Sequence, residues 1–569
     1  MEGNRYQQPT QSPDYTVNAT QHHSDALLFH ALHRAWDMAT PDLTSLLQNI
    51  VQRFPLAMTL RASDTYTPLH KALQHGNTLS EVAPFLQEFS ELTNVDRLLF
   101  LNYERDTPLH IAIACAAPYN TLQKLIDVQR TVLCMPNRDD FTPLHNLFNH
   151  SPDLATPAHI RLLSFPESTP QNDKLLMCVD DKRQTPLYQA LVNNLNAQLG
   201  VWNHHDTANF VEIISMLVDT QQDVLVHRNQ AVMHPRNMFD LGGIEMNTPL
   251  HLAVQRRMPW TILEVLIDRH QNVLFMKNFM DVHSKNQQST PLHIAVQLAL
   301  PEDTVVGLMD QGAQVLLARN HFNDMPLHTA LHYEFDATRP WSPHVVQSQN
   351  ECTKTLILRG VEAHVDFLLH TGHGGDTALH AAVKHDASLD MVRMLVHGDD
   401  QVLCIANFFG EDDDDTQENR EQDTPLHSAL KRGTDNTVLE CLLDASKVVL
   451  FMTNSDEETP VHIAARLGMK PNIIQFLIPD RGPPAHLPDA PFDVRLTKNK
   501  DGNTPLHLAL LAASGAAVVQ LLVDADGDVL STNNNDGNTP WHLALLESLD
   551  FDVMQLLEQP GSSCAQKDM

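Results

Sequence analysis

The chain has 569 residues, 42% of them hydrophobic, and its 70 acidic residues against 38 basic ones give a net charge of −32 at pH 7. A surface this negative repels nucleic acid and anionic membranes and favours basic or mixed-charge partners. No apolar run of about 18 residues is present, and no basic stretch followed by an apolar core stands at the N-terminus, so we expect neither a membrane span nor a secretory signal.

The N-terminal 64 residues differ from the rest of the chain. Residues 1–24 are rich in Gln, Pro, Thr and Asn and lack periodic apolar content, which predicts a disordered tail. Residues 25–64 contain Ala26–Leu32, which aligns with a sequence repeated further on but has lost its Thr and Pro. Terminal copies of a repeat are atypical because one face meets water, so 25–64 is predicted to be a degenerate capping repeat.

The stretch Asp501–Leu510, DGNTPLHLAL, recurs in varied form over residues 65–558. Its Asp-Gly-Asn start is typical of a tight turn. Thr504 is a favoured helix N-cap and Pro505 suits the first helical position. The apolar residues that follow fall on one helical face. One short helix cannot bury this stripe alone, whereas a stack of copies can.

Twelve copies of a T-P-L-H signature stand along the chain, some of them 35 residues apart (142 − 107, for instance) and the others 40 to 63 apart. This pattern resembles the ankyrin repeat, whose period is about 33 residues with a T-P-L-H-x-A signature. The resemblance implies an all-α repeat solenoid of helix-turn-helix units with finger loops, about 12 to 13 repeats in one curved array. The copies lie at Thr67 and His70, Thr107 and His110, Thr142 and His145, Thr248 and His251, Thr290 and His293, Thr424 and His427, Thr504 and His507, and Thr539 and His542, with altered copies at Thr185, Met325, Thr377 and Thr459.

The chain departs from the family in two ways. Leu repeatedly stands where the family carries Asn, after the Val that follows the second helix, as at Leu274 and Leu403. The Gly between the two helices is often missing. We therefore expect finger loops that pack differently from the family's usual hairpin, and a loose tail over 559–569. Clusters of Pro, Asn, Asp and Gly predict loop inserts near 151–172, 193–207, 227–246, 334–350, 408–423 and 480–497.

The residues that could carry chemistry form no recognised catalytic set. By the resemblance, each signature His links neighbouring loops through hydrogen bonds of its imidazole. His328 and His332 are four apart and could share a metal on one helix face, but no third ligand is evident, so no metal is expected. No HExxH, GxSxG, Walker-type or GxGxxG motif is present, so we expect no catalytic residues and no cofactor. The seven cysteines are scattered, which predicts reduced thiols.

Cations gather at one position of the middle and late repeats. In the family, the two residues after H-x-A-x lie at the end of the inner helix, on the concave face. The turns above this basic surface are acidic and include Asp423 and the run 411–415. The basic surface fits an acidic or phosphorylated stretch of an extended segment of mixed charge. Alternatively, the cations only neutralise neighbouring carboxylates, in exposed pairs of little energetic weight. At and beside these positions the chain carries Arg256, Arg257, His332, Tyr333, Lys384, His385, Lys431, Arg432 and Arg466.

The resemblance implies a non-catalytic scaffold that binds a partner protein, or an extended segment of one, through the concave face and finger loops. On this view the chain is a cytoplasmic monomer with no nucleic-acid partner. Changing Lys431 and Arg432 to Glu would then abolish binding and leave thermal stability nearly unchanged. The alternative is an enzyme or effector toxin that uses the array to recruit its substrate, since long arrays rich in Gln, Asn and His are similar to effectors that intracellular bacteria deliver into the host cytosol.

Overall fold

A computed structural model describes most of the region in which the repeats were predicted. The predicted tails 1–24 and 559–569, the capping repeat 25–64 and the acidic run 411–415 lie outside the described residues. Among the described residues, β-type backbone pairing is limited to one isolated antiparallel bridge, between Thr371 and Thr377. The described residues are 66–75, 101–128, 130–164, 170–194, 202–219, 221–228, 247–278, 288–332, 343–363, 366–407, 422–479, 493–523 and 528–558.

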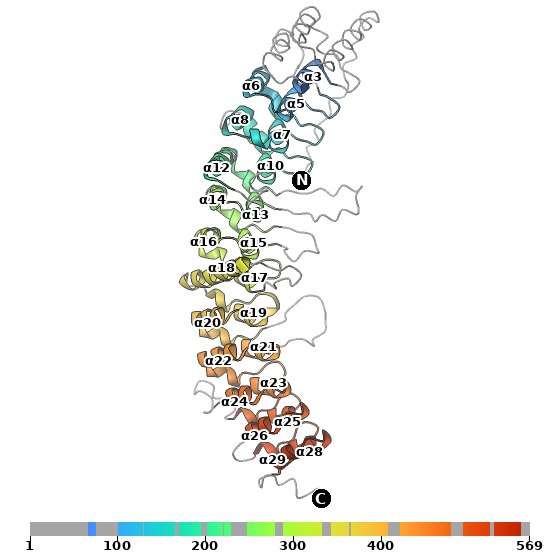
Figure 1. The fold of residues 1–569 in the computed structure, drawn as a ribbon, viewed down its shortest axis with the longest axis vertical. Helices are drawn as coiled ribbons and strands as arrows, with labels where there is room; N and C mark the ends of the chain where they lie inside the picture. Colours follow the sequence, from blue (N-terminus) through green and yellow to red (C-terminus); the bar gives the residue numbers. More distant parts are fainter. Residues whose placement is uncertain are drawn as a thin grey trace, which may run out of the picture. The chain divides into compact units, whose positions relative to one another are not determined.

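Contacts divide the chain into two compact units, Met1–Val273 and Leu274–Met569, and each is a stack of helix pairs (Figure 1). In each pair an inner helix begins at the signature and an outer helix follows. The first unit has the inner helices α3 (Pro68–His75), α5 (Pro108–Ala114), α7 (Pro143–His150), α10 (Pro186–Asn193) and α13 (Pro249–Gln255), and the outer helices α6 (Tyr119–Val128), α8 (Pro157–Leu163), α12 (His204–Asp219) and α14 (Trp260–Asp268).

The second unit repeats the arrangement, with each inner helix packed on the next inner helix of the stack. Its inner helices are α15 (Pro291–Gln297), α17 (Pro326–Leu331), α19 (Ala378–Lys384), α21 (Pro425–Arg432), α23 (Pro460–Arg466), α25 (Pro505–Leu511) and α28 (Pro540–Leu546). Its outer helices are α16 (Glu302–Asp310), α18 (Pro343–Glu362), α20 (Leu389–Gly398), α22 (Asn436–Ala445), α24 (Pro471–Leu477), α26 (Ala516–Leu522) and α29 (Phe551–Leu557). This is the all-α repeat architecture that the sequence predicted.

A short helical turn follows most outer helices and buries the Val-Leu pair noted in the sequence. Val132 and Leu133, for example, are both buried. The Leu that replaces the family's Asn is therefore a core residue. These turns are η3 (Arg130–Cys134), η5 (Gln222–Leu225), η6 (Gln271–Phe275), η7 (Ala313–Val315), η8 (Asp366–Leu369), η10 (Asp400–Cys404), η11 (Lys447–Phe451) and η12 (Val494–Leu496). In two repeats the short helices α9 (Pro170–Met177) and α27 (Asp528–Ser531) stand at the equivalent position. Two further short turns, η4 (Pro152–Leu154) and η9 (His373–Gly375), lie at other positions of their repeats.

The finger turns are closed by an asparagine that the sequence analysis overlooked. Asn454, five residues after Val449, accepts hydrogen bonds through its side-chain oxygen from the backbone N–H groups of Asp456 and Glu458, each at 3.0 Å. Asn137, Asn499 and Asn534 make the same contact to the residue four further on. The asparagine side chain thus satisfies backbone donors that the turn leaves unpaired.

The turn between the two helices has left-handed backbone even where Gly is missing. Gly433 and Gly468 hold φ angles of 74° and 60°, and Ala299 and Ala513 hold 48° and 51° at the equivalent place. A residue with a Cβ pays about 1–2 kcal/mol for this conformation. The helix ends therefore keep the family's geometry without the family's glycine. Packing of the flanking helices offsets the conformational cost of the left-handed residue.

Most inner helices begin as the signature predicts. Thr107 has extended backbone (φ −80°, ψ 162°), its hydroxyl accepts from the backbone N–H of His110, and Pro108 occupies the first helical position. The His110 side chain in turn accepts from the backbone N–H of Thr107. This reciprocal cap satisfies two of the donors that a helix start leaves open.

In most repeats the signature histidine joins the repeat to the next one. Nδ1 of His110 lies 3.2 Å from the backbone nitrogen of Thr107, which donates to it, so Nε2 carries the proton. Nε2 donates to the backbone oxygen of Phe141, at 2.8 Å, in the following finger. The same link, at 2.9–3.2 Å, runs from His70 to Asp106, His145 to Gln184, His293 to Asp324, His328 to Asp376, His380 to Asp423, His427 to Glu458, His462 to Asn503 and His507 to Asn538.

The apolar face of each inner helix lies between layers. Leu69, Leu292 and Leu506, the signature leucines of three repeats, are fully buried. Burial of an aliphatic side chain contributes about 1.5–3 kcal/mol. The stack, rather than any single repeat, therefore holds the fold together.

Three ranges predicted to be loop inserts contain α-helix. The range 151–172 includes α8, the outer helix of its repeat, 193–207 includes the start of α12, and 334–350 includes the start of α18. In α8 and α18 the Pro residues that suggested loops, Pro157 and Pro343, stand at the first helical position, where the missing backbone N–H costs nothing. The remaining predicted inserts fall largely outside the described residues.

We expect Thr424→Val to destabilise its repeat by about 1–2 kcal/mol, because Val keeps the volume but removes the hydroxyl that lies 2.8 Å from Nδ1 of His427 and caps α21. Amide hydrogen exchange of α21 in the full chain measures the loss. Thr437→Val, at an exposed site on α22, is the control and should change stability by less than about 0.5 kcal/mol. Equal effects of the two changes would contradict the role of the hydroxyl.

The chain should lose stability as pH falls below the ordinary histidine range. Burial lowers the pKa of His145, His293, His380, His462 and His507 to about 4, and of His328 and His427 to about 3. The unfolded chain therefore binds more protons between about pH 6.5 and 4, and each histidine withdraws about 1.4 kcal/mol per pH unit there. Thermal unfolding followed by circular dichroism from about pH 7 to 5 should show a steep fall in Tm. A flat profile over that range would refute the burial of neutral imidazoles.

Candidate functional site

One position of each repeat forms a row of exposed or half-exposed side chains at the ends of the inner helices. We call this row the inner column; its members stand seven residues after the first residue of each signature. Because the inner helices of a unit pack side by side, successive members are neighbours. In the second unit the inner column consists of Gln297, His332, Lys384, Lys431, Arg466, Leu511 and Leu546, and in the first of Gln74, Ala114, Asn149, Val192 and Gln255.

Three cations of the inner column pair with buried carboxylates of their own repeats. Lys384 lies 2.7 Å from Asp376, Lys431 lies 2.6 Å from Asp423, and Arg466 lies 3.1 Å from Glu458. The carboxylate side chains are 1–7% exposed, whereas the cations are 29–44% exposed. In each pair the cation is therefore partly exposed to solvent, whereas the carboxylate is buried between repeats.

The carboxylate belongs to the residue just before the signature, and the next repeat also holds it. Asn407 donates to Asp376 at 3.0 Å, and Asn454 donates to Asp423 at 3.2 Å. The backbone oxygens of both aspartates accept from signature histidines. Groups from three successive repeats thus fix the positions of Lys384 and Lys431.

The inner column holds a lysine or arginine only where the residue before the signature is acidic, although an acidic residue does not require one: Ala114 stands in the column of the repeat that Asp106 precedes. Where Asn247 stands before the signature, the inner column holds Gln255, and the two amides share a 3.0 Å hydrogen bond. Where Asn503 and Asn538 stand there, the column holds leucines. The cations therefore appear only where a carboxylate lies beneath them.

The remaining predicted residues are less uniform. Arg432 lies 3.2 Å from Asp386, and both are well exposed. Arg256 ends α13 and Arg257 follows in left-handed backbone, with φ 54°. Tyr333 lies outside the described residues.

His332 belongs to a cluster of rings rather than to an ion pair. Its ring centroid is 5.0 Å from that of His385 and 6.5 Å from that of His328. Burial is the largest cause that lowers the pKa of His332, against the opposite influence of Asp324. In the described part of the chain, no group of three or more His, Cys, Asp or Glu side chains could hold a metal ion.

This geometry corrects one expectation about the cations. A Glu at position 431 would face the carboxylate of Asp423, which is only 1% exposed. Reversing the charge of Lys431 cannot leave stability unchanged, because a buried like-charged pair is strongly unfavourable. A test of binding therefore needs variants in which the cation and its buried carboxylate are replaced together.

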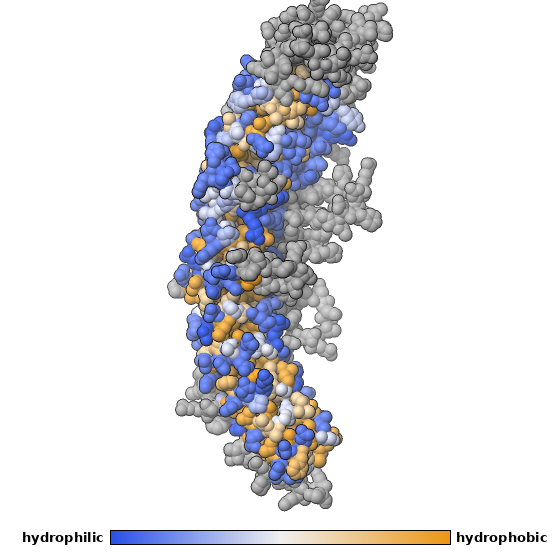
Figure 2. Space-filling model, viewed as in Figure 1, coloured by the Kyte–Doolittle hydropathy of each residue, from blue (hydrophilic) through white to orange (hydrophobic). Residues whose placement is uncertain are grey.

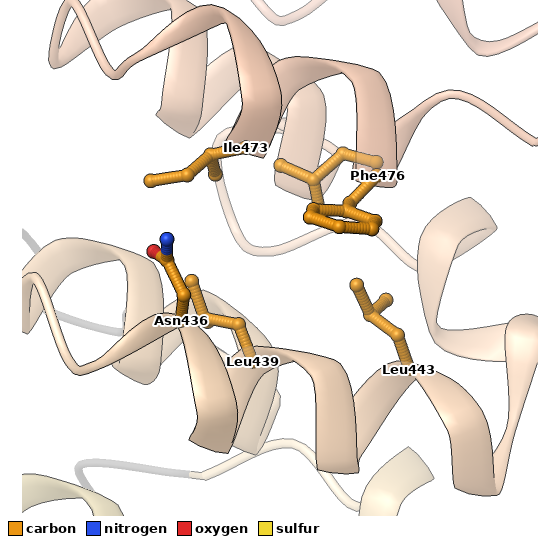
Figure 3. Close-up of a pocket in the computed structure, with 6 residues that line it drawn as sticks. Asn436, Leu439, Leu443, Ile473 and Phe476 are labelled. Carbon is orange, nitrogen blue, oxygen red and sulfur yellow. The ribbon is translucent and has the colours of Figure 1, made fainter.

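A shallow apolar crevice lies between the outer helices α22 and α24 (Figure 3). Its empty volume of about 210 Å³ is open to solvent. Leu439 and Leu443 of α22 face Ile473 and Phe476 of α24 across it, with Asn436 at one end. No charged or nucleophilic side chain lines it, so it offers contact area rather than chemistry.

Comparison with known proteins identifies the repeat. Residues 401–489 match the family model of three ankyrin-repeat copies, and residues 374–407 and 501–534 match the model of the single ankyrin repeat. The matched residues thus form ankyrin repeats, and ankyrin repeats are in general protein-interaction modules.

Other comparisons add little. No curated protein matches the chain. Among solved structures, a chain from the complex of a predatory endopeptidase of Bdellovibrio bacteriovorus with an immunity protein is 23% identical, with coverage of 41% of this chain and 95% of that chain. Its TM-score is 0.28, so this match supports no conclusion. Among the described helices, none is both long and apolar enough to cross a membrane.

We expect Lys431→Gln to cost about 1–3 kcal/mol, because it leaves Asp423 buried with no cation. Adding Asp423→Asn should restore most of the loss by recreating the amide pair that Asn247 and Gln255 form naturally. Hydrogen exchange of α21 measures both variants, and Lys447→Gln on the exposed part of η11 is the matched control. If the second substitution worsened the loss, the pair would not be the source of the stability.

Proposed function

We propose that the chain is a non-catalytic scaffold whose inner column binds an acidic or phosphorylated segment of a partner protein. The observation that supports this most directly is the row of three cations, each held over a buried carboxylate at the same position of successive repeats. We infer that it acts as a cytoplasmic monomer.

The pairing prepares the cations for a ligand as well as neutralising the carboxylates. A free lysine or arginine loses about 1.5–2 kcal/mol of side-chain entropy when a ligand immobilises it. Lys384 and Arg466 are already fixed by their carboxylates, so a ligand meets positioned donors. Such preorganisation favours binding even though each pair is formally neutral.

Donors remain for a ligand after the pair has formed. A guanidinium has five N–H donors, and Arg466 gives Nε–H and one Nη2–H to Glu458. An ammonium has three, and Lys384 gives two to Asp376. An incoming carboxylate or phosphate would lie closer to each cation than to the anion beneath it, so attraction exceeds repulsion.

The experiment uses a neutral swap that the chain itself suggests. In the variant Asp376→Asn, Lys384→Gln, Asp423→Asn, Lys431→Gln, two ion pairs become amide pairs like that of Asn247 and Gln255, and the net charge is unchanged. Fluorescence anisotropy with labelled peptides rich in Glu or phosphoserine, and with their Gln and Ser analogues, measures binding to the full chain.

The wild type should bind the acidic peptides more tightly than their neutral analogues, and the swapped variant should lose at least about tenfold in affinity. Thermal unfolding is the control, since the swap is expected to preserve the fold. If the swapped variant bound acidic peptides as well as the wild type does, the cations would serve the stack alone.

A further inference from the structure

The inner column changes from charged to apolar at the C-terminal end of the second unit. Leu511 is 45% exposed and Leu546 is 69% exposed, and Leu467, beside Arg466, is 45% exposed. Hydrophobic residues gather over the C-terminal repeats at the lower end of Figure 2. A cluster of this kind is unusual on a protein surface and often marks an interaction site.

The stack does not require these leucines. At the same position the chain carries Gln255 and Gln297, which shows that a polar side chain is compatible with the fold there. Leu506 and Leu510 of the same helix are fully buried and supply its core contacts. Leu511 and Leu546 therefore add apolar surface to the column without filling the interior.

The spacing of the column fits an extended chain. Helices that pack side by side lie about 8–10 Å apart. A chain in the extended polyproline II conformation advances about 3.1 Å per residue and has three residues per turn, so every third side chain points the same way. A segment laid along the inner column therefore passes from one repeat to the next about every three residues.

We propose that the segment bound by the inner column is extended and has two distinct parts. In this polyproline II conformation, two apolar side chains about three residues apart lie against Leu511 and Leu546, and acidic or phosphorylated residues follow at the same interval, opposite Arg466, Lys431 and Lys384. This proposal rests on the proposed function and adds the partner's pattern to it. Because the two parts differ in polarity, they also fix the direction in which the segment runs along the helices.

A random peptide library displayed on phage tests the pattern without a known partner. The library is selected on the full wild-type chain, and a labelled copy of the most enriched peptide is then titrated against three proteins: the wild type, the neutral swap and the variant Leu511→Gln, Leu546→Gln. The last variant uses the residue that the column already carries at Gln255 and Gln297.

Enriched peptides should have apolar residues three apart and acidic residues beyond them, and each variant should weaken binding at least about tenfold. Purely acidic peptides that the leucine variant still binds would overturn the apolar part and leave the proposed function standing. Peptides insensitive to both variants, or no enrichment, would overturn both. Concentration-dependent dimers of the wild type that the leucine variant abolishes would show that a second copy covers this face, which also overturns the inference.

Discussion

The structure depends on a neutral imidazole that is satisfied on both sides. In most repeats Nδ1 of the signature histidine accepts from the backbone N–H of the threonine of its own repeat, and Nε2 donates to a backbone oxygen of the next, as in His507, whose Nε2 donates to Asn538. A buried ring that lacked either partner would bear a desolvation cost of about 1–3 kcal/mol. His328 shows this state, since Met325 replaces threonine and its Nδ1 is buried with no partner in the described structure. Neighbouring layers support such a defect because each repeat is covered on two sides.

The residue whose backbone oxygen accepts the imidazole hydrogen bond also determines the charge of the inner column. Asp423 accepts from His380 through its backbone oxygen, while its side chain holds Lys431 and the asparagine of the next finger. The backbone part of this role is indifferent to residue type, because Phe141 and Gln184 serve equally well. The side-chain part changes the charge of the inner column. One residue thus serves both roles, stacking through its backbone oxygen and surface charge through its side chain.

The sequence was sufficient for the repeat, because each of its features acts locally. Thr504 and Pro505 specify a helix start within three residues, and the apolar stripe follows from helical period. The ion pairs were harder to foresee, because the carboxylate and the cation stand eight residues apart, at opposite ends of a short helix. A long side chain leans back toward the helix N-terminus and spans that distance. Comparing the residue before each signature with the inner column would have revealed the pairing. The left-handed turns at Ala299 and Ala513 could not be foreseen, because packing of the flanking helices overrides local preference there.

One chain contains several solutions to the same local problem. The residue before the signature and its column partner form an Asp-Lys pair, a Glu-Arg pair, an amide pair or an Asn with an exposed Leu, all on the same helical scaffold. Since the backbone oxygens of Asp423, Glu458 and Asn503 all accept from the histidine of the preceding repeat, the need to stack does not select among their side chains. The amide pair occupies the same position without burying a charge. Consecutive cations followed by exposed leucines are what binding of the proposed acidic and apolar segment would require.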